Sequence, residues 1–114
     1  MKSLFLFVAL FLFVSEAFAA SPGETIYKAN CEMCHGSSGA GDGPVGKALN
    51  PKPANYKNVF KAYKNKEALK THIMDILEKG KPGTPMASYR TMPLKEREAV
   101  ADYLITTHTN FKGK

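Results

Sequence analysis

The segment Cys31-Glu32-Met33-Cys34-His35 constrains the fold of this chain more than any other feature. It fits C-x-x-C-H, the attachment motif for c-type haem. Two thiols at this spacing add to the two vinyl groups of haem, and a histidine directly after the second cysteine is then held against the iron. The motif therefore predicts Cys31 and Cys34 as thioether attachment sites and His35 as the proximal iron ligand.

Two other uses of a cysteine pair fit the sequence less well. A C-x-x-C disulfide is usually redox-active and lies in a thioredoxin-like βαβ context, but no such strand pattern flanks this pair. A structural zinc site takes four ligands, typically in two pairs. The chain has only 2 cysteines, and its other histidines, His72 and His108, are isolated. One covalently bound haem c is therefore the expected cofactor.

Residues 1–19 have the pattern of a secretory signal peptide. Lys2 supplies the positive start, residues 4–14 (LFLFVALFLFV) form an unbroken apolar run, and Ala17-Phe18-Ala19 supplies small residues at the two positions that a signal peptidase recognises. The pattern predicts export of the chain across the inner membrane of a bacterium into the periplasm.

Cleavage after Ala19, or alternatively after Ala20, leaves one mature domain of residues 20–114. A membrane span needs about 20 apolar residues, so the apolar run is too short for stable membrane insertion. The remaining alternative for this segment is an uncleaved anchor at the membrane interface. A periplasmic protein rarely meets chromosomal DNA, so nucleic acid is not an expected partner of this basic chain.

The iron of an electron-carrying c-type haem commonly takes a methionine as its second protein ligand. Met86 is the leading candidate because it ends the segment 80–86 (GKPGTPM), which has too many glycines and prolines for a helix. A rigid loop of this kind can present a thioether to a metal.

Other side chains remain open as alternatives for the sixth position. Met92 precedes Pro93 at an expected helix start, where apolar residues commonly pack on the core. His72 would give bis-histidine coordination and a lower midpoint potential. Met33 lies inside the haem-binding turn, and Met74 lies in a helical core pattern, so both are weaker candidates.

Helix signals occur in three parts of the mature chain. A capping box of Ser21 and Glu24 predicts a helix over 22–33. An asparagine before it and a glycine after it predict a helix over 66–79, with positions 69, 73, 76 and 77 on its apolar face. A third helix is expected over 93–107, with residues 99, 100, 103 and 104 buried.

The segments between these helices are rich in glycine and proline. Residues 36–46 are expected to form a flexible loop close to the haem edge, and residues 49–56 an extended segment. No alternating strand pattern of convincing length and no internal repeat is present. The predicted fold is all-α, with three to four helices packed around one covalently attached haem.

These features occur in the order found in a known family. The chain resembles a mono-haem class I cytochrome c, of the type of small bacterial periplasmic cytochromes and the cytochrome c modules of terminal oxidases. The residues that carry the resemblance are Gly23-x-x-x-Tyr27, Cys31–Gly36 (CEMCHG), Gly39–Pro44 (GAGDGP), Gly83–Met86 (GTPM) and Val100–Leu104 (VADYL).

The resemblance implies that the first and last helices cross. In the family pattern, Gly23 and Tyr27 pack against Val100 and Tyr103, with the glycine permitting a close approach of the two helices.

The resemblance also implies roles for residues around the haem. Pro44 is the expected carbonyl partner of the His35 Nδ1–H, with Pro51 and Pro53 as competitors. Tyr56 and Tyr89 are expected to contact haem propionates or to close the pocket, with a surface position as the alternative for both.

The function implied by the resemblance is one-electron transfer by a monomeric carrier with His35/Met86 ligation. No Ser/His/Asp triad, paired carboxylates or second cofactor motif appears, so the chain is not expected to be an enzyme. Two alternatives stay open, namely a haem-based ligand binder or sensor, and an electron-transfer subunit of a larger respiratory complex.

The charge of the chain suggests the kind of redox partner. There are 16 Lys and Arg residues against 10 Asp and Glu, which gives a net charge of +6. Lysines are dense along residues 57–81, at positions 57, 61, 64, 66, 70, 79 and 81. They form either a solvated face or a rim that steers an acidic redox protein toward the haem edge.

Overall fold

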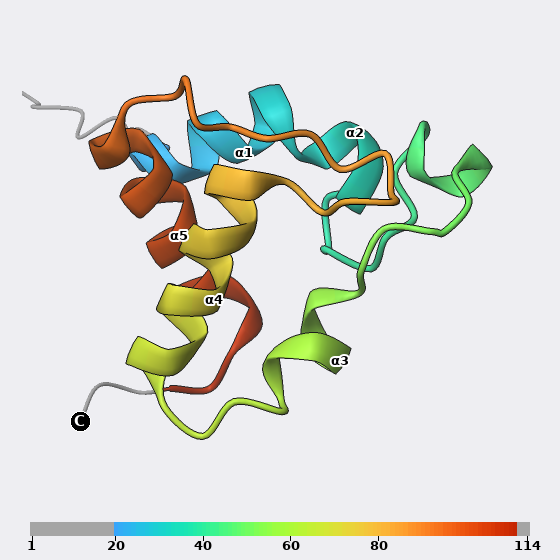
Figure 1. The fold of residues 1–114 in the computed structure, drawn as a ribbon. Coiled ribbons are helices and arrows are strands. Elements are labelled where there is room, and N and C mark those ends of the chain that lie inside the picture. The colour runs from blue at the N-terminus through green and yellow to red at the C-terminus, as the bar shows by residue number, and fades with distance from the viewer. Residues whose placement is uncertain (1–19, 112–114) are drawn as a thin grey trace, which may run out of the picture.

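The computed structural model describes residues 20–111, which form helices and connecting loops without a strand. The helical elements in this range are α1 (Pro22–Asn30), α2 (Glu32–His35), the 3₁₀-helix η1 (Gly46–Ala48), α3 (Tyr56–Phe60), α4 (Lys66–Lys79) and α5 (Leu94–His108). Figure 1 shows α5 packed against both α1 and α4, with α2 and α3 on the other side of α4. The predicted all-α cytochrome c fold is confirmed.

The expected signal peptide, residues 1–19, and its cleavage site lie outside the described residues. Within the range that the structure describes, no helix is long and apolar enough to cross a membrane.

Capping residues explain where α1 begins and where α4 begins and ends. The Ser21 side chain accepts a hydrogen bond of 3.2 Å from the Glu24 amide at the start of α1. The Asn65 side chain accepts one of 2.8 Å from the Ala68 amide at the start of α4, and Gly80 ends this helix with a φ of 68°. These bonds satisfy amides that have no partner inside their helix. The predicted bounds of α4 are confirmed.

The first helix is shorter than predicted. It ends at Asn30 instead of continuing to residue 33, because the φ of −118° at Cys31 departs from that of a regular helix and interrupts it. The Asn30 side chain also donates to the Ile26 carbonyl, 3.0 Å away, at this end of the helix. The chain then starts the separate short helix α2, which ends at His35.

The structure contains two short helical elements that the sequence did not predict. One is η1, and the other is α3, which begins where an extended segment was expected to end. Tyr56 and Phe60 lie one turn apart on α3, and both are buried. The last helix also begins one residue later than predicted, because Pro93 has the extended backbone of a cap, with ψ 142°.

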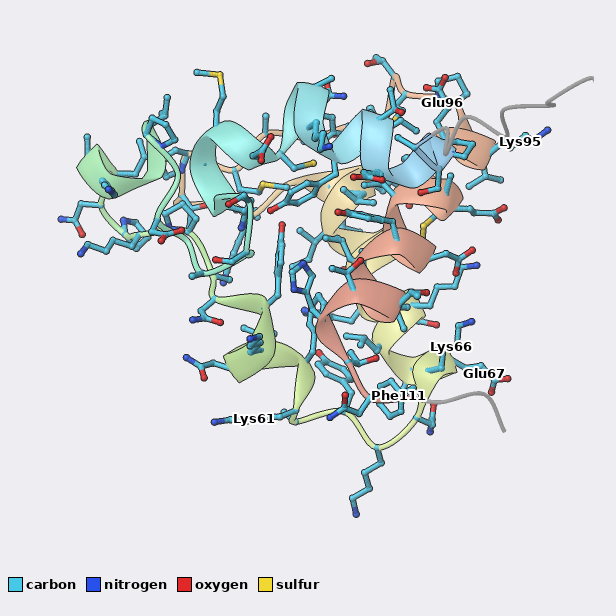
Figure 2. The ribbon with its side chains drawn as sticks, turned by 180° about the vertical axis from the view of Figure 1, so that it is seen from behind. Lys61, Lys66, Glu67, Lys95, Glu96 and Phe111 are labelled. Carbon is cyan, nitrogen blue, oxygen red and sulfur yellow. The ribbon has the colours of Figure 1, made fainter. Side chains whose placement is uncertain are left out.

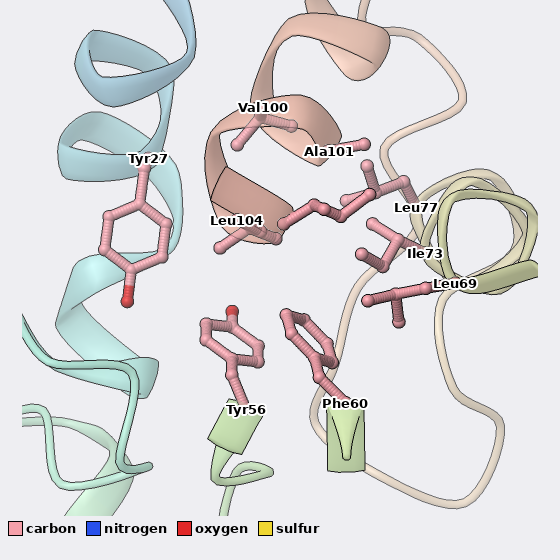
Figure 3. Packing of buried hydrophobic residues seen from close by; sticks show 10 residues of the cluster. Tyr27, Tyr56, Phe60, Leu69, Ile73, Leu77, Val100, Ala101 and Leu104 are labelled. Atoms are coloured by element: carbon pink, nitrogen blue, oxygen red, sulfur yellow. The ribbon is translucent and has the colours of Figure 1, made fainter. Parts of the chain in front are cut away.

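The apolar core joins the three longer helices and α3 (Figure 3). Tyr27 reaches down from α1, and Tyr56 and Phe60 rise toward it from α3. The remaining buried hydrophobic residues are Leu69, Ile73 and Leu77 of α4 and Val100, Ala101, Leu104 and Ile105 of α5. Ile76, which was expected on the same apolar face of α4 as Ile73 and Leu77, is only partly buried, and all three residues line one cavity.

The crossing of α1 and α5 confirms the close helix approach expected at Gly23. A Cβ atom on Gly23 would overlap the carbonyl oxygen of Ala99 and lie 2.6 Å from the Cβ of Tyr103. The rings of Tyr27 and Tyr103 fill the next turn, with centroids 5.6 Å apart. The backbone contact is with Ala99 instead of its neighbour Val100.

Replacing Gly23 with alanine is therefore expected to destabilise the fold. The new methyl group meets backbone atoms, which cannot move without separating the two helices, so we expect a loss of about 1–3 kcal/mol in the free energy of unfolding. For a domain of this size, each kcal/mol lowers the melting temperature by roughly 4–8 °C. Thermal unfolding measures this, with Thr25→Ala on the exposed face of α1 as the control. Equal melting temperatures of the Gly23→Ala and control variants would contradict the prediction.

Candidate functional site

The two cysteines of the motif line one cavity of about 310 Å³. Its walls come from the haem-binding motif, the segment before α3, helices α3 and α4, the loop after α4 and Leu104 of α5. Most lining residues are apolar, among them Leu49, Pro53, Val59, Ile73, Ile76, Leu77, Pro85 and Leu104. An apolar cavity of this kind suits a large flat hydrophobic ligand.

The thiols of Cys31 and Cys34 are free, and both are half-buried. Burial raises the pKa of the Cys31 thiol to about 11, and the neighbouring Cys34 adds to this rise. A thiol with such a pKa stays protonated at neutral pH, whereas redox-active cysteine pairs have lowered pKa values. The surroundings of Cys31 therefore disfavour a catalytic disulfide.

His35 presents one ring nitrogen to the protein and leaves the other unbonded. Its Nδ1 lies 3.3 Å from the carbonyl oxygen of Ala54, so Nε2 is the nitrogen available to a ligand in the cavity. Burial lowers the pKa of the imidazole and favours the neutral form, which is the form that binds metals. The ring is also stacked on Tyr56, with centroids 4.7 Å apart and planes at 17°.

The structure corrects the expected role of Pro44. The carbonyl beside His35 belongs to Ala54, and Pro44 is exposed in a separate shallow hollow on the outer side of α2. The adjoining residues explain this placement, because the amide of Gly43 donates to the Cys34 carbonyl and that of Val45 donates to the Met33 carbonyl.

Pro51 and Pro53, the competitors of Pro44, line the main cavity beside Ala54, but neither carbonyl bonds to His35. A backbone carbonyl can come from any residue type, so no sequence signal pointed to Ala54.

Met86 lies in the loop that follows α4 and lines the same cavity as His35. Four hydrogen bonds shape this loop, and one of them runs from the Thr84 amide to the Lys81 carbonyl at 3.1 Å. The Lys81 amide donates to the Met86 carbonyl at 3.2 Å, the Thr84 hydroxyl donates to the Lys81 carbonyl at 2.6 Å, and the Met86 amide donates to the Thr84 hydroxyl at 3.2 Å. The loop therefore holds Met86 in a defined position at the cavity wall.

The other sixth-ligand candidates differ in their positions. Met33 is 59% exposed, and Met74 packs against the core. Neither of these two methionines nor Met92 lines the cavity, but His72 does. The geometry thus leaves Met86 and His72 as the side chains that can face His35 across the cavity.

The two tyrosines expected near the haem both line the cavity. Tyr56 is buried between His35 and Phe60, whose ring centroid lies 5.2 Å from its own, and burial raises the pKa of its hydroxyl. The Tyr89 hydroxyl donates a hydrogen bond of 3.0 Å to the carbonyl of Asn30, at the end of α1. This bond closes the side of the cavity next to Cys31.

These residues fit a c-type haem. Both cysteines line an apolar cavity, an imidazole with an oriented ring follows them, and the thioether of Met86 lines the same cavity. The Tyr27 hydroxyl donates to the carbonyl of Gly36, directly after the motif, and so fixes α2 to α1.

The model for the family described as cytochrome c oxidase, cbb3-type, subunit III matches residues 18–104 of the chain. A solved chain from the Kuenenia stuttgartiensis reducing HAO-like protein complex is similar in structure, with a TM-score of 0.64 and 26% sequence identity. The match covers 78% of this chain but only 42% of that one, so this chain spans less than half of its length. No curated protein matches the sequence significantly.

Proposed function

Because the chain belongs to the family of c-type cytochrome modules described as cytochrome c oxidase, cbb3-type, subunit III, we propose that it is a periplasmic electron carrier with one covalently bound haem c. Membership of this family implies haem-based electron transfer rather than catalysis. The single observation that supports the finer proposal is the cavity that Cys31, Cys34, His35 and Met86 share.

Each of these residues has a distinct part in the proposed mechanism. Cys31 and Cys34 would hold the haem through thioethers, and the imidazole of His35 and the thioether of Met86 would bind its iron. When bound, haem supplies an iron that cycles between Fe(II) and Fe(III) with little change in geometry. The Ala54 carbonyl keeps the His35 ring in one orientation and raises its basicity. The apolar walls exclude water and so influence the midpoint potential.

The first test is the optical spectrum of the ferric holoprotein. Coordination by His35 and Met86 predicts a weak band in the red region that arises from the methionine–iron bond. Absence of this band from the native protein would contradict Met86 as a ligand and favour an open iron or His72.

One alternative function has an observation in its favour. The family is described as an oxidase subunit, and the similar solved chain is part of a protein complex. Both are consistent with an electron-transfer subunit of a larger respiratory complex. Co-purification of the native protein with a membrane oxidase or reductase would favour this alternative, whereas a monomer in the periplasmic extract would favour the carrier.

We also propose that a lysine surface guides an acidic redox partner. Ion pairs occupy two of the lysines in the 57–81 region, since Lys70 bonds to Asp102 and Lys79 to Asp75. The remaining lysines of that region gather mainly on and after α3. Most of them belong to a longer segment, residues 43–66, that contains no acidic residue. The lysine surface consists of the lysines of this segment, namely Lys47, Lys52, Lys57, Lys61, Lys64 and Lys66.

This lysine surface lies beside the cavity. Lys52 is itself one of the residues that line the cavity, and α3 forms part of its wall. In Figure 2, Lys61 and Lys95 lie at opposite ends of the molecule. A negative group attracted to the lysine surface would therefore approach the proposed haem, whereas one attracted to Lys95 would not.

Reversing charge at Lys57 and Lys61 is therefore expected to slow oxidation of the reduced protein by anionic hexacyanoferrate(III). Electrostatic steering changes association rates by about tenfold or more at low ionic strength. We expect the double Lys→Glu variant to react about 3- to 10-fold more slowly, and the difference to shrink at about 1 M salt, where the Debye length is near 3 Å.

The matched control compares Lys61→Glu with Lys95→Glu, since each single substitution changes the net charge by the same amount. Stopped-flow rates should separate the two variants. Equal slowing in both would mean that only net charge matters and that the lysine surface has no particular role.

A further inference from the structure

The backbone carbonyl at the end of α1 has a hydrogen-bond partner that lies far away in the sequence. The last carbonyls of a helix have no partner within it and need one from elsewhere. At the last residue of α1, the Asn30 carbonyl accepts a hydrogen bond from the Tyr89 hydroxyl, 3.0 Å away. Asn30 directly precedes Cys31, and Tyr89 follows Met86 in the same loop. This bond therefore connects the chain beside the haem attachment site with the loop that carries the proposed sixth ligand.

The other hydrogen bonds of this loop are local. Within residues 80–89, Lys81, Thr84 and Met86 bond to one another, and the Ser88 hydroxyl and the Tyr89 amide donate to the Glu78 and Leu77 carbonyls near the end of α4. These bonds give the loop its shape and attach it to the helix from which it emerges. They do not hold it against the opposite wall of the cavity.

We propose that Tyr89 is a positioning residue whose hydroxyl keeps the loop closed over the cavity and so limits how often Met86 leaves the iron. The inference rests on the proposed ligation by Met86. Opening of the loop requires the bond to Asn30 to break, since Tyr89 lies only three residues after Met86. Loss of this bond should increase the fraction of molecules in which the sixth position is free.

The surroundings of Tyr89 allow its hydroxyl and its ring to be tested separately. The ring is partly buried, packs against the core and lines the cavity. Burial raises the pKa of the hydroxyl, which therefore remains a hydrogen-bond donor across the neutral pH range. A Tyr89→Phe substitution keeps the ring and removes only the donor.

The experiment measures binding of imidazole to the ferric holoprotein, because imidazole must displace Met86. Loss of one ordinary hydrogen bond from the closed state corresponds to about a 2- to 10-fold rise in apparent imidazole affinity. We expect this rise in Tyr89→Phe. The red methionine–iron band should also disappear at a lower pH than in the native protein.

The matched control is Tyr103→Phe, which removes a hydroxyl from the α1–α5 crossing, where the ring packs on Tyr27. This variant should bind imidazole as the native protein does. Hydrogen exchange supplies a readout that does not depend on iron, because the Lys81 amide, which donates to Met86, should exchange faster in Tyr89→Phe than in the control.

Each outcome distinguishes the two proposals. If the native protein lacks the red band, the Met86 ligation fails and the role of Tyr89 fails with it. Suppose that the band is present, but that Tyr89→Phe matches the native protein in imidazole affinity, in the pH at which the band disappears and in hydrogen exchange of the Lys81 amide. Only the role of Tyr89 is then overturned.

Discussion

Replacing both Cys31 and Cys34 with alanine is expected to leave a chain that does not fold. Without its thioethers the chain would have to fold around a cavity of about 310 Å³. At roughly 24 cal/mol for each Å³ of enclosed cavity, that volume corresponds to a cost of at most about 7 kcal/mol, because part of the cavity is open to solvent. A small domain has a total stability of only about 5–15 kcal/mol. A cost approaching this size is between about half and all of that stability, so we expect the chain without haem to be largely unfolded.

Far-ultraviolet circular dichroism measures this loss as a decrease in helical signal. The control is Met33→Ala, which changes the exposed residue between the two cysteines and should leave haem content and helical signal unchanged. A second comparison, the unmodified chain produced without haem, should resemble the double alanine variant. A cooperative thermal transition with native-like helical signal in the double variant would refute the prediction.

Replacing Met86 with alanine should separate iron ligation from retention of the haem. The proposed thioethers to Cys31 and Cys34 should keep the haem attached, while the sixth position of the iron becomes open. The red band should be lost, and cyanide should bind without a competing ligand. The midpoint potential should fall on the order of 0.1 V or more, within the roughly 0.8 V range over which axial ligands set haem potentials.

Met92→Ala and His72→Ala are the matched controls, because each removes an alternative sixth ligand. Both should retain the red band and a potential close to that of the native protein. Persistence of the band in Met86→Ala, together with its loss in Met92→Ala, would transfer the ligand role to Met92. A native protein that lacks the band, and whose spectrum changes in His72→Ala, would transfer it to His72.

Local side-chain signals were sufficient to predict the long helices. Ser21 and Asn65 accept the hydrogen bonds expected of N-caps, and Gly80 ends α4. Helix α3 was missed because it has a single turn and a single buried pair, Tyr56 and Phe60. A pair of this kind is too short to produce a periodic pattern.

The candidate site could likewise be predicted from the sequence only in part. Cys31, Cys34 and His35 form a contiguous motif, so their shared position needs no knowledge of tertiary structure. The contact between the Ala54 carbonyl and His35 and the hydrogen bond between Tyr89 and Asn30 depend on how distant segments pack together. Every residue has a backbone carbonyl, so the sequence gives no signal for the one that is used. Assignment of the iron ligands themselves stays a prediction that the spectra decide.

The contact between Gly23 and Ala99 has a consequence for the order in which the molecule assembles. These residues touch although almost the whole described chain separates them. Contacts between distant parts of a sequence form late, because the entropy of closing a long loop must be overcome first. Until α5 packs against α1, Cys31 and Cys34 belong to an open chain in which a thiol can be reached from several directions.

After that packing, both thiols are half-buried. We therefore expect formation of the proposed thioethers to precede closure of the two ends of the domain.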